Sequence, residues 1–298
     1  MSRNVPKLEE NKKSALQVAT LKKEAKEVSV GVGRRKIKFA GQYVLSRHGS
    51  EAPNPTAIAV DISDDMSNDE IQTRTKRIAG FNFDFQNRKL KLHMIAIRST
   101  SDDAQKFEAA VRQVTENASL PLVLCSLRPN VLEAGLDVAG RKRPLLYAAT
   151  RENWSEIVVL AKKYDCPVTV SAPGDLTTLK SLAKKLLKHG VQELVLDPGT
   201  FPSEGLSFTV DNFAKVRKAA GEKDEVFSFP LLGVPMIAWV GRSEVLSEIA
   251  AWQEACLAAA FLVGYADVLI LHSLFGWSLL PITVLNDEIH TSPKVPFA

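Results

Sequence analysis

The chain has 298 residues, of which 45% are hydrophobic and 24% are charged, a composition that suits a globular protein with one large domain and a short arm. The net charge of +4 comes from a lysine- and arginine-rich segment in the first forty residues, so the rest of the chain is not strongly basic. We predict a solvated basic arm or linker at residues 1–27. No aromatic residue is interleaved with these charges before Phe39, so a nucleic-acid contact is the less favoured alternative.

The three cysteines, Cys125, Cys166 and Cys256, lie far apart and form no C-x-x-C pair. We therefore expect buried structural thiols, no iron–sulfur cluster and no structural zinc in this chain. No apolar segment near the N-terminus is typical of a signal peptide, and the most apolar stretch, residues 255–271, is interrupted by a glycine and an aspartate. These features predict a cytoplasmic protein without a membrane span.

Residues 28–55 precede the main body of the chain and begin with a period-two pattern. Apolar and polar residues alternate over residues 28–40, with glycines where the chain would reverse, which is typical of a β-hairpin. We expect this hairpin to cover the bottom of the main domain, residues 56–298.

Eight short apolar runs then recur, most of them followed by a helix-patterned segment. Runs that are this short and continuously apolar are typical of parallel strands buried on both faces. They occupy residues 56–61, 92–97, 121–125, 144–149, 167–171, 193–197, 229–237 and 267–272. The predicted fold is an α/β protein, a (β/α)8 TIM barrel with an N-terminal basic arm and β-hairpin. In such a barrel the functional residues lie at the C-terminal ends of the strands.

Three of the intervening helices have clear boundaries. One begins after Ser101, and a second is capped by Asp175, has leucines on one face and lysines on the other, and ends at Gly190. We expect the lysine face to be solvated. A long apolar helix begins at Ser243 and runs to Val263.

Polar residues at the strand ends are the candidate functional groups. The candidates for binding a cofactor are Asp61, Arg98, Asn153, Asp197, Thr200 and His272. If the barrel closes, we expect all but Thr200 to meet in one concavity at the C-terminal ends of the strands.

Each candidate also has a purely structural interpretation. Asp61 and Asp197 could cap helices, Arg98 could pair with one of these carboxylates, and His272 could be a hydrogen-bonded structural residue. The chain lacks the H-E-x-x-H, G-x-S-x-G and P-loop motifs, so these catalytic classes are not favoured. We predict no metal site and assign no catalytic residue.

Several strings resemble a known family. They are residues 44–64, Pro121-Leu-Val-Leu-Cys-Ser126, residues 143–154 with Leu146-Tyr-Ala-Ala-Thr150, and Leu194-Val-Leu-Asp-Pro-Gly-Thr200. Together and in this order they resemble the barrel domain of the large (gamma) subunit of the corrinoid iron–sulfur protein, which belongs to the acetyl-CoA decarbonylase/synthase system. The resemblance runs from about Val28 to the C-terminus.

This resemblance implies a role in one-carbon metabolism, where the family carries a methyl group on cobalt. The resemblance implies a four-cysteine cluster domain and a corrinoid domain in family members. This chain has no match for either, and we therefore expect an excised barrel, a split subunit or a paralogue. Residues 47–51 also depart from the family pattern. The resemblance implies a second barrel subunit and a corrinoid-binding partner, with cobalamin supplied by that partner.

Two functions are compatible with these observations. The first is a scaffold subunit that presents a corrinoid domain supplied elsewhere, which the lack of a catalytic motif favours. The second is a pterin-dependent methyltransferase, acting on methyltetrahydrofolate or tetrahydromethanopterin, in which Asp61, Asn153 and Asp197 would hold the pterin ring. The two differ in whether these three side chains are free or already engaged in caps and ion pairs.

Overall fold

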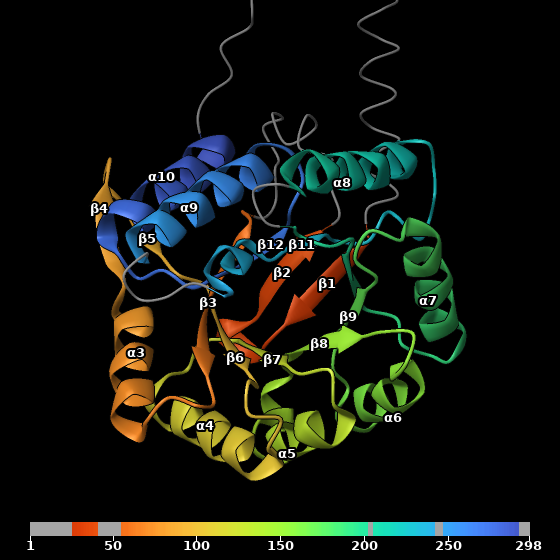
Figure 1. The fold of residues 1–298 in the computed structure, drawn as a ribbon, viewed down its shortest axis with the longest axis horizontal. Helices are drawn as coiled ribbons and strands as arrows, with labels where there is room; N and C mark the ends of the chain where they lie inside the picture. Colours follow the sequence, from red (N-terminus) through yellow and green to blue (C-terminus); the bar gives the residue numbers. More distant parts are fainter. Residues whose placement is uncertain (1–25, 41–54, 202–204, 242–246, 292–298) are drawn as a thin grey trace, which may run out of the picture.

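A computed structural model describes residues 26–40, 55–201, 205–241 and 247–291 (Figure 1). Eight parallel strands form one sheet in the order β10-β9-β8-β7-β6-β3-β12-β11. Their bounds are β3 Ala57–Ser63, β6 Met94–Arg98, β7 Leu122–Cys125, β8 Leu145–Ala149, β9 Val168–Ser171, β10 Leu194–Asp197, β11 Leu232–Gly233 and β12 Val268–Leu271. A parallel bridge between Leu196 and Leu231, with the amide of Leu196 donating to the carbonyl of Pro230 at 2.8 Å, joins the two edges of the sheet.

The strands are buried on both faces, as their apolar sequences predict. All seven residues of β3 are buried, as are all four of β7, β9, β10 and β12. The predicted (β/α)8 barrel is confirmed. The seventh strand is shorter than its nine-residue apolar run, because only β11 pairs and the chain then forms the 3-10 helix η4, Pro235–Trp239. Pro230 and Pro235 flank β11 and lack the amide hydrogen that a longer ladder needs.

Eight α-helices surround the barrel (Figure 1) in the described part of the chain. They are α3 Asn68–Gly80, α4 Ala104–Asn117, α5 Pro129–Ala139, α6 Trp154–Tyr164, α7 Leu176–Lys188, α8 Leu206–Gly221, α9 Ser247–Gly264 and α10 Gly276–Thr291. Asp175 caps α7 as predicted, since its side chain accepts from the amide of Thr178 at 2.9 Å. The predicted start of the long helix at Ser243 lies outside the described residues.

The N-terminal hairpin covers the bottom of the barrel. Strands β1, Glu27–Val30, and β2, Ile37–Ala40, pair antiparallel on either side of the short 3-10 helix η1, Gly33–Arg35. The amide of Gly31 donates to the carbonyl of Arg143 at 3.0 Å, just before β8 begins. The predicted hairpin is therefore confirmed, while the basic arm up to residue 25 and residues 41–54 lie outside the described residues.

A second hairpin was not expected. Strands β4, Asn82–Phe85, and β5, Arg88–Lys91, pair antiparallel between α3 and β6, and Gln86 and Asn87 at the turn have positive φ angles of 49° and 63°. The alternating sequence of β4 and an asparagine in the turn could have predicted it. No described helix has both the length and the apolar character that crossing a membrane requires.

Candidate functional site

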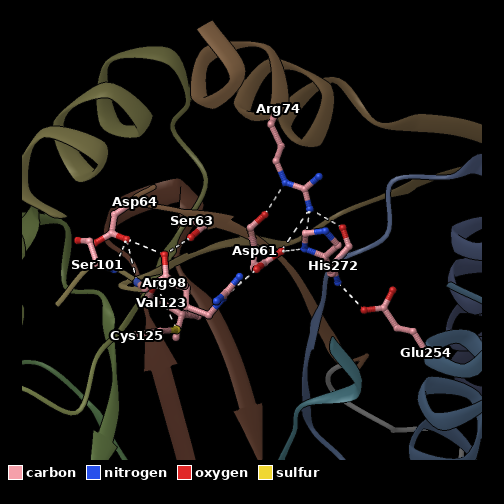
Figure 2. Close-up of polar contacts among 11 residues, drawn as sticks. Asp61, Ser63, Asp64, Arg74, Arg98, Ser101, Val123, Cys125, Glu254 and His272 are labelled. Atoms are coloured by element: carbon pink, nitrogen blue, oxygen red, sulfur yellow. Dashed lines mark hydrogen bonds and ion pairs between the residues drawn. The ribbon is translucent and has the colours of Figure 1, made fainter. Parts of the chain in front are cut away.

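Asp61 lies near the C-terminal end of β3 and is the centre of an ion-paired cluster (Figure 2). Its Oδ1 lies 2.6 Å from Nδ1 of His272, and its Oδ2 accepts from Nε of Arg98 at 3.1 Å. Arg74 of α3 donates to Oδ1 at 3.2 Å and to the Asp61 carbonyl at 2.7 Å. The capping interpretation of Asp61 is therefore wrong, because its carboxylate faces three side chains and the next helix is capped by Ser67.

This environment keeps Asp61 ionised. Burial opposes the charged form, but the hydrogen bond and positive charge from His272, with the charges of Arg74 and Arg98, outweigh it and lower the pKa of Asp61 below its ordinary value. An ionised carboxylate can only accept, so Nδ1 of His272 carries the hydrogen of their short bond. The other ring nitrogen, Nε2, then serves as an acceptor in the neutral imidazole and as a donor when the ring is protonated.

A buried glutamate holds the backbone of His272. Glu254 of α9 is 1% exposed and accepts from the amides of His272 and Ser273 at 2.5 and 2.8 Å. Burial raises the pKa of Glu254 to about 7, although the two amides act in the opposite direction. The ring of His272 also packs on Trp239, with 4.6 Å between ring centroids, so backbone and ring are both fixed.

Asp64, three residues after Asp61, joins two strand-end loops (Figure 2). Its carboxylate accepts from the side chains of Ser99, Thr100 and Ser101 and from the amides of Thr100 and Ser101, at 2.7 to 3.1 Å. These bonds connect the loop after β3 to the loop after β6 and position the end of β6, where Arg98 lies.

Asp197, at the end of β10, belongs to a separate network. Its Oδ2 accepts from the hydroxyls of Tyr147 and Ser171 at 2.8 and 2.9 Å, and its Oδ1 accepts from the amide of Gly199 at 2.9 Å. Burial raises the pKa of Asp197, and these three hydrogen bonds reduce the shift without reversing it. It does not cap a helix, since α8 begins only at Leu206, so this interpretation is wrong as well.

Asn153 and Thr200 form hydrogen bonds that connect neighbouring loops. Asn153 accepts from the amide of Thr150 at 2.7 Å and donates to the carbonyls of Leu127 and Ala148 at 2.8 and 3.1 Å. Thr200 accepts from the amide of Val234 at 2.9 Å, which connects the loop after β10 to the end of β11. Both side chains therefore organise backbone at the mouth of the barrel.

The structure brings Asp61, Arg98 and His272 into direct contact and leaves Asp197, Asn153 and Thr200 in other interactions. The expected ion pair of Arg98 with one of the two aspartates is confirmed. Sequence reasoning missed Arg74 and Glu254, both of which come from helices and not from strand ends. The detectable signal for Glu254 was its position as a lone acidic residue within an apolar helical stretch.

Metal-binding chemistry has little support in the described residues. Among them, no three histidine, cysteine, aspartate or glutamate side chains are grouped so that they could hold a metal ion. Burial raises the thiol pKa of both Cys125 and Cys166 to about 12, so neither is a ready thiolate ligand. The cluster at Asp61 can present one imidazole nitrogen and part of the Arg98 guanidinium to a ligand.

Comparison with known proteins identifies the family. Residues 27–298 match the family model described as CO dehydrogenase/acetyl-CoA synthase delta subunit. The acetyl-CoA decarbonylase/synthase complex subunit gamma 2 of Methanosarcina thermophila is 42% identical to this chain, with 98% of this chain and 63% of that protein covered. The chain belongs to this acetyl-CoA decarbonylase/synthase subunit family.

The family relationship extends to more distant archaeal gamma subunits. That of Methanothermobacter thermautotrophicus is 37% identical, with 92% of this chain and 59% of that protein covered. This acetyl-CoA decarbonylase/synthase family member thus spans less than two thirds of the length of these relatives.

Similar solved structures support the fold alone. Dihydropteroate synthase from Thermus thermophilus has a TM-score of 0.55 at 13% identity, covering 88% of this chain and 97% of that one. The enzyme from Xanthomonas albilineans, solved with 7,8-dihydropteroate, has a TM-score of 0.60 at 12% identity, covering 80% and 95%. At these identities the likeness extends to the barrel and not to the ligand.

Proposed function

We propose that this chain is the barrel subunit of a corrinoid-dependent methyl-transfer system in one-carbon and acetyl-CoA metabolism, and that it acts mainly as a scaffold. Family membership supports the metabolic context, since the relatives are named as subunits of the acetyl-CoA decarbonylase/synthase complex. The observation that carries the scaffold role is that Asp61, Asn153 and Asp197, the side chains that would hold a pterin, already have partners within the chain.

A pterin-binding site needs free donors and acceptors, because a buried polar group of the ligand left unpaired costs about 1–3 kcal/mol. Asp61 is held by two arginines and a histidine, Asn153 by backbone groups on both sides, and Asp197 by two hydroxyls and an amide. A pterin would have to displace these partners. This argument favours the scaffold over the methyltransferase.

The same side chains also indicate whether the barrel could bind cobalamin itself. A resident corrinoid would need several unsatisfied polar groups around the macrocycle besides a cobalt ligand. Nε2 of His272 could serve as that ligand, but Nδ1 bonds to Asp61 and the neighbouring carboxylates are already hydrogen-bonded. This donor set does not fit a corrinoid held by the barrel alone. We therefore assign the corrinoid to a separate domain supplied by a partner, with a second barrel subunit as the other partner, in the cytoplasm.

Two titrations test the proposal. Hydroxocobalamin is added to the 298-residue protein and removed by gel filtration, and the absorbance spectrum is recorded; the scaffold proposal expects no retained corrinoid band. Methyltetrahydrofolate and methyltetrahydromethanopterin are then titrated calorimetrically, and no binding is expected up to millimolar ligand.

A variant pair distinguishes the alternative. If either pterin binds the wild type, and Asp197→Ala abolishes binding while exposed Asp211→Ala does not, the methyltransferase function replaces the scaffold. If no pterin binds, Asp197→Ala should only lower stability, by about 1–3 kcal/mol, because half-buried Tyr147 and buried Ser171 lose their acceptor.

A further inference from the structure

An open groove runs along the outer side of α7, away from the barrel mouth. Its volume is about 610 Å³, and it is lined by seven residues of α7, four of them lysines, together with Phe227 from the loop that follows α8. Every one of these residues belongs to the described part of the chain. The groove combines an apolar end, formed by Leu176 and Phe227, with a positively charged wall.

Three of the four lysines form a row along the helix. Lys180, Lys184 and Lys188 are spaced by four residues, which places them on one face of α7 and about 6 Å apart along its axis. Lys184, Lys185 and Lys188 are exposed, and none of the three forms an ion pair with an acidic residue in the described ranges. The groove therefore presents positive charge that its own surroundings leave uncompensated.

Contacts within the chain hold both walls of the groove in place. Lys180 pairs with Asp224, and its Nζ lies 5.5 Å from the centre of the Phe227 ring. The Asp224 carboxylate also accepts from two amides of its own loop, at 3.1 and 3.3 Å, so this loop is fixed against α7. Lys185 lies over the ring of Trp154 on α6, at 5.4 Å. Because these side chains are already ordered, binding a ligand costs less conformational entropy.

The segments outside the described residues carry too little negative charge to match this groove. Residues 1–25, the longest of these segments, contain six lysines and arginines but three glutamates. Each of the other four, residues 41–54, 202–204, 242–246 and 292–298, contains at most one acidic residue. An occupant of complementary charge therefore comes from another molecule.

The spacing of the lysine row matches an extended acidic peptide. In an extended chain, side chains on one side recur every two residues, about 6.6 Å apart, and the long lysine side chains can absorb the difference from about 6 Å. Single-stranded nucleic acid has the same sign of charge, but it is normally held by bases stacked on exposed aromatic rings. Phe227 is 8% exposed and offers no such ring face, so the peptide is favoured.

We propose that the α7 groove binds an extended segment of a partner protein, with acidic residues at alternate positions and an apolar residue at one end. The acidic side chains pair with the lysine row, and the apolar residue packs at Leu176 and Phe227. This inference goes beyond the scaffold role and does not depend on it. The groove lies outside the barrel mouth and its test uses neither pterin nor corrinoid, so either proposal can fail without the other.

Fluorescence anisotropy of the full chain with a labelled peptide tests the proposal. The peptide has a leucine followed by glutamates that alternate with serines, and a second peptide has glutamine in place of each glutamate. At an ionic strength of about 0.05 M we expect saturable binding of the glutamate peptide, with a Kd below about 1 mM, and none of the glutamine peptide. Binding should weaken as the ionic strength rises to about 0.3 M, because salt screens exposed charges.

A pair of double variants locates the site. Lys184→Glu/Lys188→Glu should weaken binding about tenfold or more, since it replaces two attractions by two repulsions. Lys76→Glu/Lys106→Glu makes the same change of net charge at exposed lysines of α3 and α4, across the barrel from α7 (Figure 1), and should bind like the wild type. Circular dichroism verifies folding. If the charge reversal prevents folding, Lys184→Gln/Lys188→Gln should still weaken binding about threefold or more.

Several outcomes would overturn the proposal. They are no saturable binding of the glutamate peptide, equal binding of the glutamine peptide, or equal losses in the α7 double variant and its control. Tighter binding of a labelled oligothymidylate than of the glutamate peptide would show that the groove takes nucleic acid instead. A wild-type dimer in sedimentation equilibrium that Lys184→Glu/Lys188→Glu abolishes would show that a second copy of the chain occupies the groove, and this would also contradict the proposal.

Discussion

Replacing Asp61 by asparagine should destabilise the fold strongly. The Asp61 side chain is fully buried and that of Arg74 is 16% exposed, so the loss of the carboxylate leaves a nearly buried guanidinium without its counter-charge. Arg98 is 31% exposed and can regain water, so it contributes less. Breaking a buried pair from one side costs about 3–5 kcal/mol, and we expect the lower part of this range because asparagine keeps one acceptor oxygen.

The effect of Asp61→Asn should depend on pH. The pKa of Asp61 is lower in the folded state than its ordinary value of 3.8, so the carboxylate stabilises the fold above that value. This stabilisation is lost as the pH falls through the folded-state pKa. The difference between wild type and variant should therefore be full at neutral pH and should shrink in acid.

Urea unfolding monitored by circular dichroism at about pH 7 and in steps down to about pH 3 measures both effects. Exposed Asp211→Asn is the control and should change the free energy of unfolding by less than about 0.5 kcal/mol. If Asp61→Asn does not fold, the double variant Asp61→Asn/Arg74→Met should recover part of the stability, because it removes both buried partners. A loss below about 1 kcal/mol at neutral pH would show that the cluster is not a buried ion-paired site.

Two further predictions concern Glu254 and Gly199. The pKa of Glu254 is raised from 4.5 to about 7, so the folded state holds this proton more tightly than the unfolded state. The free energy of unfolding of the wild type should therefore fall as the pH rises from 4.5 to about 7. Glu254→Gln should flatten this pH dependence in urea unfolding, and an equal dependence of the unfolding free energy on pH in both proteins would contradict the assignment. Gly199 has a φ of +96°, and an added Cβ would lie 2.7 Å from Cα of Pro173. Gly199→Ala should therefore lower the free energy of unfolding by more than about 1 kcal/mol, whereas Gly276→Ala, whose Cβ would meet nothing within 4 Å, should not.

The sequence by itself predicts the barrel because the relevant signals are local. Parallel strands buried on both faces are mostly apolar, and the runs that become strands are mostly apolar, with polar residues mainly near their C-terminal ends. This holds even for the seventh run, where prolines shorten the pairing. The cap at Asp175 and the N-terminal hairpin also depend on residues close together in the chain. The β4–β5 hairpin was also predictable from local sequence, because β4 alternates apolar and polar residues and the turn contains an asparagine.

The roles of the mouth residues depend on contacts that only barrel closure creates. Asp61 and His272 are 211 positions apart, and Asp197 meets a tyrosine 50 positions before it. A carboxylate at a strand end can cap a helix, form an ion pair or accept from hydroxyls, and residue type alone does not decide among these. The choice depends on which side chains from other strands and helices lie within about 3 Å, as Arg74 and Glu254 show, and tertiary packing determines those neighbours.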